Sequence, residues 1–166
     1  ASGSNQVPSA TATSLSAPMQ TLTGTSFAAP QVTGTAALLL EKYPWMTNNN
    51  LRTTLLTTAT DLGALGVDSV YGWGLLNVGK AINGPAQFAF GDFVATTDGG
   101  TYTFSNDISG SGGLVKSGGG NLILTGNNSY VGNTSVNSGT LTVTNRSTSN
   151  HTIANGATLI ASDATL

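Results

Sequence analysis

The chain of 166 residues contains no cysteine, and this absence excludes disulfide bonds and metal sites built on thiolates. Charged residues make up only 7% of the chain, whereas soluble domains usually carry about a quarter. Five Lys and Arg stand against seven Asp and Glu without a basic cluster, which excludes an electrostatic basis for binding nucleic acid. No apolar run approaches the roughly 20 residues that a membrane-spanning helix needs.

The segment from Gly24 to Gly34 places a hydroxyl group at the start of a run of small and apolar residues. Its sequence is Gly-Thr-Ser-Phe-Ala-Ala-Pro-Gln-Val-Thr-Gly. A serine at a helix N-terminus lies beside N–H groups without intrahelical partners, and such donors stabilise the oxyanion of acyl transfer. Ser26 is therefore the candidate nucleophile. The alternative is that Thr25 or Ser26 only caps a buried helix.

This run resembles the nucleophile segment of subtilisin-type serine proteases. The resemblance implies that Ser26 is the nucleophile, that Gly24, Thr25 and Ser26 form the nucleophile loop, and that the Ser26 N–H is one oxyanion donor. It also implies a protein or peptide substrate. No cofactor is expected, and we assign no metal site because the sequence shows no acidic cluster.

Two helices are expected after the nucleophile. Residues 27–43 are apolar or small on all sides, which predicts a central buried helix with Pro30 in its first turn. Its exit to solvent is marked by Glu41, Lys42 and Pro44. Thr47 is the expected N-cap of a second, surface helix, whose packed face would comprise Leu51, Leu55, Leu56 and Ala59.

A further segment, Tyr71 to Val78, resembles the Gly-x-Gly-x-apolar-Asn sequence that closes subtilisin-like domains. Its glycines, Gly72 and Gly74, would permit a tight turn with positive φ, and Asn77 would cap a short last helix. A weaker match to the Ala-Pro-Gly loop of the family is Ala1-Ser2-Gly3, where serine replaces proline.

The resemblance covers only the end of a catalytic domain. Subtilisin-like enzymes order their triad as Asp, His and Ser, yet no Asp, Glu or His precedes Ser26. The single histidine, His151, follows Ser26 among Asn and Thr residues, so we interpret it as a surface turn residue without a catalytic role. We therefore expect this chain alone to be inactive. Because it begins with Ala in mid-domain and ends in mid-repeat, we expect a fragment of a longer enzyme.

After about residue 84 the helical spacing gives way to short alternating strands separated by Gly, Asn and Ser. The expected strands are residues 101–104, 121–124, 134–136, 140–143 and 158–160. Their short intervals, with no helices between them, favour a parallel β-helix with Leu, Ile and Val inside. The alternative is a disordered segment of low complexity.

Residues 113–141 are similar to the autotransporter-associated β-strand repeat of Gram-negative passenger domains. The matching elements occur in order: Gly-x-Leu, Lys-x-Gly-x-Gly, Leu-Thr-Gly-x-Asn-x-Tyr-x-Gly-x-Thr and a closing Gly-x-Leu. In the junction before them, the spacing of Phe88, Phe90 and Phe93 fits either a first strand or a contact with the protease. Residues 101–104 would then be an early rung.

The predicted architecture is an α/β fragment, the C-terminal part of a subtilisin-like three-layer domain, followed by an all-β parallel β-helix. Residues 1–83 form the peptidase portion, residues 84–112 the junction and residues 113–166 the repeats. The parent would supply the rest of the catalytic domain and a C-terminal outer-membrane translocator barrel, with its signal also outside this chain. It would act outside the cell or on the surface of a Gram-negative bacterium.

Two other functions fit parts of the sequence. One is a surface adhesin or structural passenger in which a degenerate protease remnant caps the β-helix. The other is a scaffold that stabilises secretion. The intact Gly-Thr-Ser run with small neighbours favours the protease, because a remnant has no need to keep it.

Overall fold

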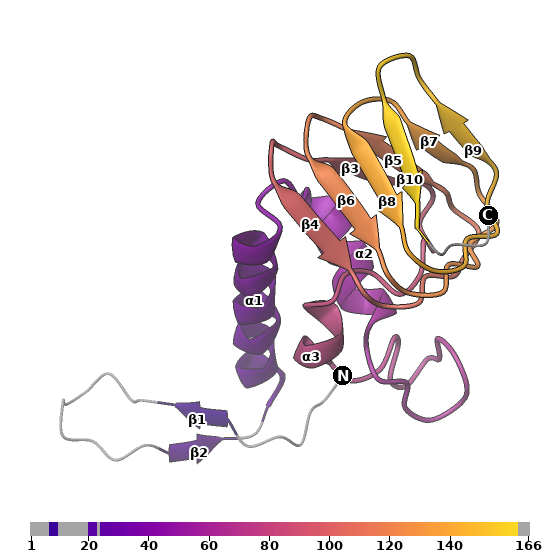
Figure 1. The fold of residues 1–166 in the computed structure, drawn as a ribbon. Helices are drawn as coiled ribbons and strands as arrows, with labels where there is room; N and C mark the ends of the chain where they lie inside the picture. The colour runs from indigo at the N-terminus through magenta and orange to yellow at the C-terminus, as the bar shows by residue number, and fades with distance from the viewer. Residues whose placement is uncertain (1–6, 10–19, 23, 163–166) are drawn as a thin grey trace.

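The computed structural model describes residues 7–9, 20–22 and 24–162 (Figure 1). A short antiparallel pair, β1 (Val7–Ser9) and β2 (Gln20–Leu22), comes before three helices. The helices are α1 (Thr25–Lys42), α2 (Asn48–Thr57) and α3 (Val78–Ala81). The strands that follow are β3 (Phe93–Thr96), β4 (Thr101–Phe104), β5 (Leu114–Ser117), β6 (Asn121–Leu124), β7 (Thr134–Val136), β8 (Thr140–Val143), β9 (His151–Ile153) and β10 (Thr158–Ala161).

Strands β3 to β10 form a parallel β-solenoid of about four turns. One sheet has the order β3-β5-β7-β9 and the other β4-β6-β8-β10, so each turn adds one strand to each sheet. Hydrogen bonds join adjacent turns, as in Asn127 N–H to Asp107 and Gly113 N–H to Asp92, whose residues lie 20 and 21 positions apart. Isolated parallel bridges, Gln87 to Ser109 and Ile108 to Asn128 among them, form a third side.

Buried residues at every second position of the strands explain this fold. In β6 and β8 every second residue is buried, and Leu122 pairs in register with Leu141 inside the solenoid. The buried core is continuous from the solenoid to Leu39 and Tyr43 at the C-terminal end of α1. The helices and the first turns of the solenoid therefore share one core.

The strands expected from the sequence are confirmed. Residues 101–104, 121–124, 134–136 and 140–143 coincide with β4, β6, β7 and β8, and β10 extends the expected 158–160 by one residue. Strands β3, β5 and β9 were not predicted as separate strands. Phe93 begins β3, so the loosely spaced aromatic residues before it lead into the first turn of the solenoid.

Helix α1 is not the central buried helix that its composition predicts. Only Thr35 and Leu39 of its residues are buried, and Val32, Leu38 and Leu40 are 43%, 46% and 41% exposed. The physical reason is that α1 stands at one side of the molecule, where α2 and α3 are the elements packed against it (Figure 1). A helix that is apolar on all sides needs covering layers on all sides, and the described residues provide only part of them.

Helix α2 begins as predicted but packs differently. Thr47 is its N-cap, and a capping box joins Thr47 to Asn50. Its buried residues include Asn50, Thr53, Thr54 and Thr57 as well as Leu51, whereas Leu55, Leu56 and Ala59 are only partly buried. The buried face of α2 is therefore largely polar. The helical spacing of its leucines predicted an apolar packed face instead.

His151 is not a surface turn residue. It is the first residue of β9, it pairs in register with Thr134, and it is half-buried. Its Nε2 atom lies 3.4 Å from the hydroxyl of Ser147. The interpretation failed because a neighbouring run of Asn, Ser and Thr residues concealed a short strand that only pairing with β7 reveals.

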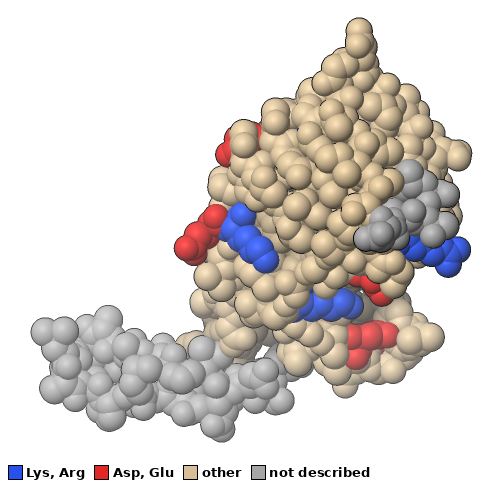
Figure 2. All heavy atoms as spheres, viewed as in Figure 1, with Lys and Arg blue, Asp and Glu red and all other residues tan. Residues whose placement is uncertain are grey.

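The surface carries few charges. On the face seen in Figure 2, a few Lys and Arg side chains lie near Asp and Glu side chains, and no patch of one sign forms. Among the residues that the structure describes, no helix combines the length and apolarity needed to cross a membrane.

Candidate active-site segment

Ser26 is the second residue of α1, and its side chain is exposed. Gly24 occupies the N-cap position, and no side-chain hydrogen bond caps the helix. The alternative role of Thr25 or Ser26 as a helix cap is therefore not what the structure shows. The Ser26 hydroxyl stands at the open end of the helix.

The backbone around Ser26 has the geometry of a helix start. The Phe27 N–H bonds to the Gly24 carbonyl at 3.1 Å, which closes the first turn. The Ser26 N–H comes one residue earlier, before any carbonyl of the helix can accept it, and lies at the positive end of the helix dipole. This end of α1 suits a developing negative charge.

Pro30 does not lie in the first turn of α1, as the sequence suggested, but inside the helix. Since the helix starts at Thr25, Pro30 falls in the second turn. A proline there has no N–H to give to the carbonyl four residues earlier, which is that of Ser26. The helix therefore loses one backbone hydrogen bond beside the candidate nucleophile, and the Ser26 carbonyl is left to other donors.

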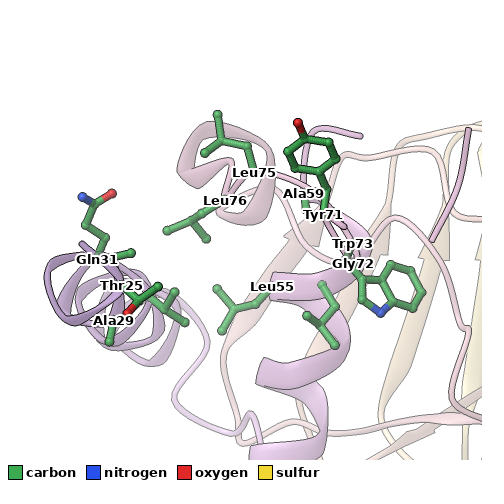
Figure 3. Close-up of a pocket in the computed structure, with 14 residues that line it drawn as sticks. Thr25, Ala29, Gln31, Leu55, Ala59, Tyr71, Gly72, Trp73, Leu75 and Leu76 are labelled. Atoms are coloured by element: carbon green, nitrogen blue, oxygen red, sulfur yellow. The ribbon is translucent and has the colours of Figure 1, made fainter. Parts of the chain in front are cut away.

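An apolar cavity of about 520 Å³ lies between the N-terminal half of α1, the C-terminal half of α2 and the segment after it (Figure 3). Its lining includes Thr25, Ala28, Ala29, Gln31, Val32, Leu55, Leu56, Ala59 and residues 71–76. Gln31 and Leu76 were not predicted to line a site. Residues 28, 31 and 32 are three and four positions apart, so they lie on one face of α1. This spacing would have placed Gln31 beside Ala28 in the lining of the cavity.

The segment that closes the cavity is built from tight turns. Gly72 and Gly74 have φ values of 60° and 103°, as expected for this segment. A Cβ atom on Gly74 would lie 2.1 Å from the Thr60 carbonyl oxygen, so only glycine fits where Thr60 pairs with Leu75. Asn77 accepts the Lys80 N–H at 2.9 Å and caps α3, which confirms its predicted role.

Asp68 fixes the loop that leads into these turns. Its Oδ1 atom accepts the N–H groups of Val70 and Tyr71, each at 2.7 Å. The hydrogen bond from Tyr71, followed by that from Val70, lowers the pKa of this carboxyl. Asp68 is therefore an ionised turn residue at neutral pH.

The histidine of the described residues does not lie beside Ser26. The single histidine of the sequence lies in β9, the strand of its sheet farthest from the helices (Figure 1). Its lack of a catalytic role stays a prediction. Within residues 7–9, 20–22 and 24–162, no group of three or more His, Asp or Glu side chains is placed to hold a metal ion. The predicted Ala1-Ser2-Gly3 loop lies outside the described residues.

Comparison with known proteins identifies both halves of the chain. The model of the subtilase family matches residues 1–74, and that of the passenger-associated transport repeat matches residues 114–143. The chain carries a segment of a subtilase followed by an autotransporter passenger repeat. The two resemblances noted in the sequence are thereby confirmed.

Several known proteins match large or small parts of this chain. The Neisserial autotransporter lipoprotein NalP of Neisseria meningitidis serogroup B is 66% identical over 123 residues, which cover 72% of this chain and 11% of NalP. An extracellular serine protease of Serratia marcescens is 39% identical over 172 residues, covering 82% of this chain and 16% of that protein. Subtilisin DY of Bacillus licheniformis is 51% identical over 61 residues, covering 36% and 21%.

The chain thus spans only 11% to 16% of the length of the autotransporter and the Serratia protease that it matches. The names of these relatives and the passenger repeat support a location outside the cell or on the surface of a Gram-negative bacterium, as predicted.

Proposed function

We propose that this chain is the nucleophile-bearing end of a subtilisin-type serine endopeptidase domain, joined to the first turns of a β-helical passenger. The observation that carries the proposal is the position of Ser26. It is exposed at the N-terminal end of α1, without a capping role, inside the residues that match the subtilase family. Residues 1–83 would belong to the peptidase domain, residues 84–112 to the junction and residues 113–166 to the repeats.

The proposed chemistry is acyl transfer. Ser26 attacks the carbonyl of a peptide bond, an upstream histidine accepts its proton, and an upstream aspartate orients that histidine. The N–H of Ser26 is one donor to the tetrahedral oxyanion, helped by the positive end of the α1 dipole. The substrate is a protein or peptide, and no step needs a cofactor. Without the upstream histidine and aspartate, the chain is inactive.

The exposed apolar surface of α1 supports a three-layer peptidase domain in the parent. Val32, Leu38 and Leu40 lie open to solvent, and the cavity beside α1 is lined mostly by apolar side chains. The upstream part of the domain would cover this surface and make α1 the central helix. The parent would also carry an outer-membrane translocator barrel, which the autotransporter relative and the passenger repeat support.

A phosphonate probe that labels activated serines tests the proposal on the full-length parent. We expect the parent to be labelled, Ser26→Ala to abolish labelling, and Ser69→Ala, which alters an exposed loop serine, to leave it unchanged. Labelling that survives Ser26→Ala would assign the nucleophile elsewhere. A folded parent that is never labelled would favour the adhesin, in which the protease segment only covers the solenoid.

A further inference from the structure

The first turn of the solenoid has an open edge on each of its sides. Strands β3 and β4 are the first strands of their sheets, and no earlier strand of the described residues pairs with them. The third side begins at residues 86–88, where Gln87 bridges to Ser109 of the next turn. Open edges leave N–H and C=O groups without ladder partners, and they invite pairing with other chains.

Asn50 of α2 covers the edge of β3. The N–H groups of Phe93 and Thr97 bond toward β5, so by alternation the carbonyl of Val94 points to the opposite, open edge. The Asn50 Nδ2 atom donates to that carbonyl at 3.1 Å, while its Oδ1 atom accepts the Thr47 N–H at 3.0 Å. One buried amide thus starts α2 and occupies the edge of β3 at the same time.

Tyr43 at the end of α1 covers the edge of β4. The carbonyls of Gly100 and Phe104 accept N–H groups from the β6 side. By alternation, the carbonyl of Thr103 points to the opposite, open edge of β4. The Tyr43 hydroxyl lies 2.8 Å from the Thr103 carbonyl oxygen and 3.0 Å from that of Ile82. The ring is fully buried, and this burial raises the pKa of Tyr43, so the hydroxyl keeps its proton as a donor.

Thr57 at the end of α2 covers the third side. Its hydroxyl accepts the Ala86 N–H at 3.2 Å and donates to the Thr53 carbonyl at 2.7 Å. Ala86 in turn accepts the Ser109 N–H at 3.0 Å, which continues the third side into the next turn. Each side of the first turn therefore has a backbone group bound by a side chain of residues 43–57.

The loop between α1 and α2 closes the interior of the same turn. The Trp45 ring packs edge-on against Phe93 and Tyr102, at centroid distances of 6.5 Å and 5.8 Å, and tilted against Phe104 at 6.0 Å. Phe93 and Phe104 are the interior residues of the first strand in each sheet. Trp45 therefore covers part of the interior at the end of the solenoid, together with Tyr43, whose ring packs against Phe104 at 5.3 Å.

We propose that residues 43–57, which belong to the subtilase part of the chain, are the N-terminal cap of the passenger solenoid. Asn50, Tyr43 and Thr57 replace the hydrogen bonds of an earlier turn on its three sides, and Trp45 replaces its side chains. In solenoids each turn contacts only its neighbours, and the terminal turns need a cap. The first turn of the passenger therefore depends on peptidase sequence for its order, whether or not Ser26 is a nucleophile.

Native-state hydrogen exchange on the 166-residue chain tests the cap one side at a time. Asn50→Asp keeps the acceptor that starts α2 but replaces the donor to Val94 with a carboxylate oxygen. We expect the amides of Phe93 and Thr97 to exchange about tenfold faster. Those of Asn137 and Thr144, which join the third turn to the second, should change less than about twofold.

The matched control is Asn49→Asp, which adds the same charge to the first turn of α2 at an exposed position and should leave all of these amides unchanged. Tyr43→Phe is the second variant, with Tyr71→Phe as its exposed control. Tyr43→Phe should accelerate hydrogen exchange at the amides of Asn121 and Thr125, which bond to carbonyls on the β4 side. Full protection of all four of these amides in both variants, or equal acceleration in every turn, would overturn the proposal.

Discussion

The ammonium group of Lys116 lies 3.1 Å from the carbonyl oxygen of Ser138, which belongs to the next turn of the solenoid. The same ammonium also donates to the carbonyls of Ser117 and Gly118, at 2.9 Å and 3.0 Å. Lys116 is fully buried inside the solenoid. It therefore ties two successive turns together by charge-assisted hydrogen bonds, which are stronger than neutral ones.

Replacing this lysine should destabilise the solenoid. Lys116→Met keeps most of the side-chain volume but leaves the carbonyls of Gly118 and Ser138 without this donor. We expect a loss of about 2 kcal/mol in the free energy of unfolding, because buried acceptors without partners cost on the order of 1–3 kcal/mol. Urea unfolding would measure it, with Lys80→Met on exposed α3 as the control. Equal stability of the two variants would contradict the role of Lys116.

Gly139 lies in the turn beside this ammonium. Its φ is 68°, and a Cβ atom there would lie 2.3 Å from the Gly118 carbonyl oxygen and 2.9 Å from the Lys116 ammonium. We expect Gly139→Ala to cost about 2 kcal/mol or more, from backbone strain and from displacement of the lysine. Gly119→Ala is the matched control, because nothing lies within 4 Å of its Cβ position. Thermal unfolding should show a large decrease for the first variant and none for the second.

Much of the solenoid was predictable from the sequence because its inward residues repeat locally. Leu122 and Leu124 take every second position of β6, and the same spacing returns in β8 with Leu141 and Val143, so the strand positions follow from local spacing. Asn50 and Lys116 could not be assigned in this way. Their partners, Val94 and Ser138, are 44 and 22 positions away, and a polar residue carries no periodic signal of such a contact.

The candidate site was predictable only where its motif is local. The run around Ser26 and the Asn77 cap are read from adjacent residues. The composition of α1 reflects a buried helix, whereas its actual exposure depends on which covering segments are present. Pro30 was misplaced because the helix begins two residues before Phe27, and no strong capping residue marks that start.

His151 should make the stability of the chain sensitive to pH. Burial lowers the pKa of this imidazole in the folded protein, whereas the unfolded chain keeps a value of about 6.5. The unfolded state therefore binds more protons between the two values, so stability decreases as the pH falls below about 6.5 and recovers as it rises. Because His151 is the only histidine, His151→Gln should flatten this dependence.

Urea midpoints measured at pH 7.5 and pH 5.5 compare the two proteins directly. Most Asp and Glu side chains titrate at lower pH, near 4, so they contribute little in this range. A wild-type midpoint that does not decrease on acidification, or an equal decrease in His151→Gln, would show that the half-buried imidazole is not the responsible group.

Residues 1–83 expressed alone should fail to form a packed domain. In the described structure, Tyr43 and Trp45 pack against Phe104, and Asn50 bonds to Val94, all supplied by the solenoid. Removal of the solenoid would expose these groups on a segment whose helix α1 already presents Val32, Leu38 and Leu40 to solvent. So much exposed apolar surface favours association or a molten state over one packed structure.

Near-ultraviolet circular dichroism and thermal unfolding should show no sharp tertiary signal and no cooperative transition for residues 1–83, while the 166-residue chain retains both. A cooperative transition in the short fragment would mean that the helices pack without the solenoid, and the shared core would then be a contact between two independent units.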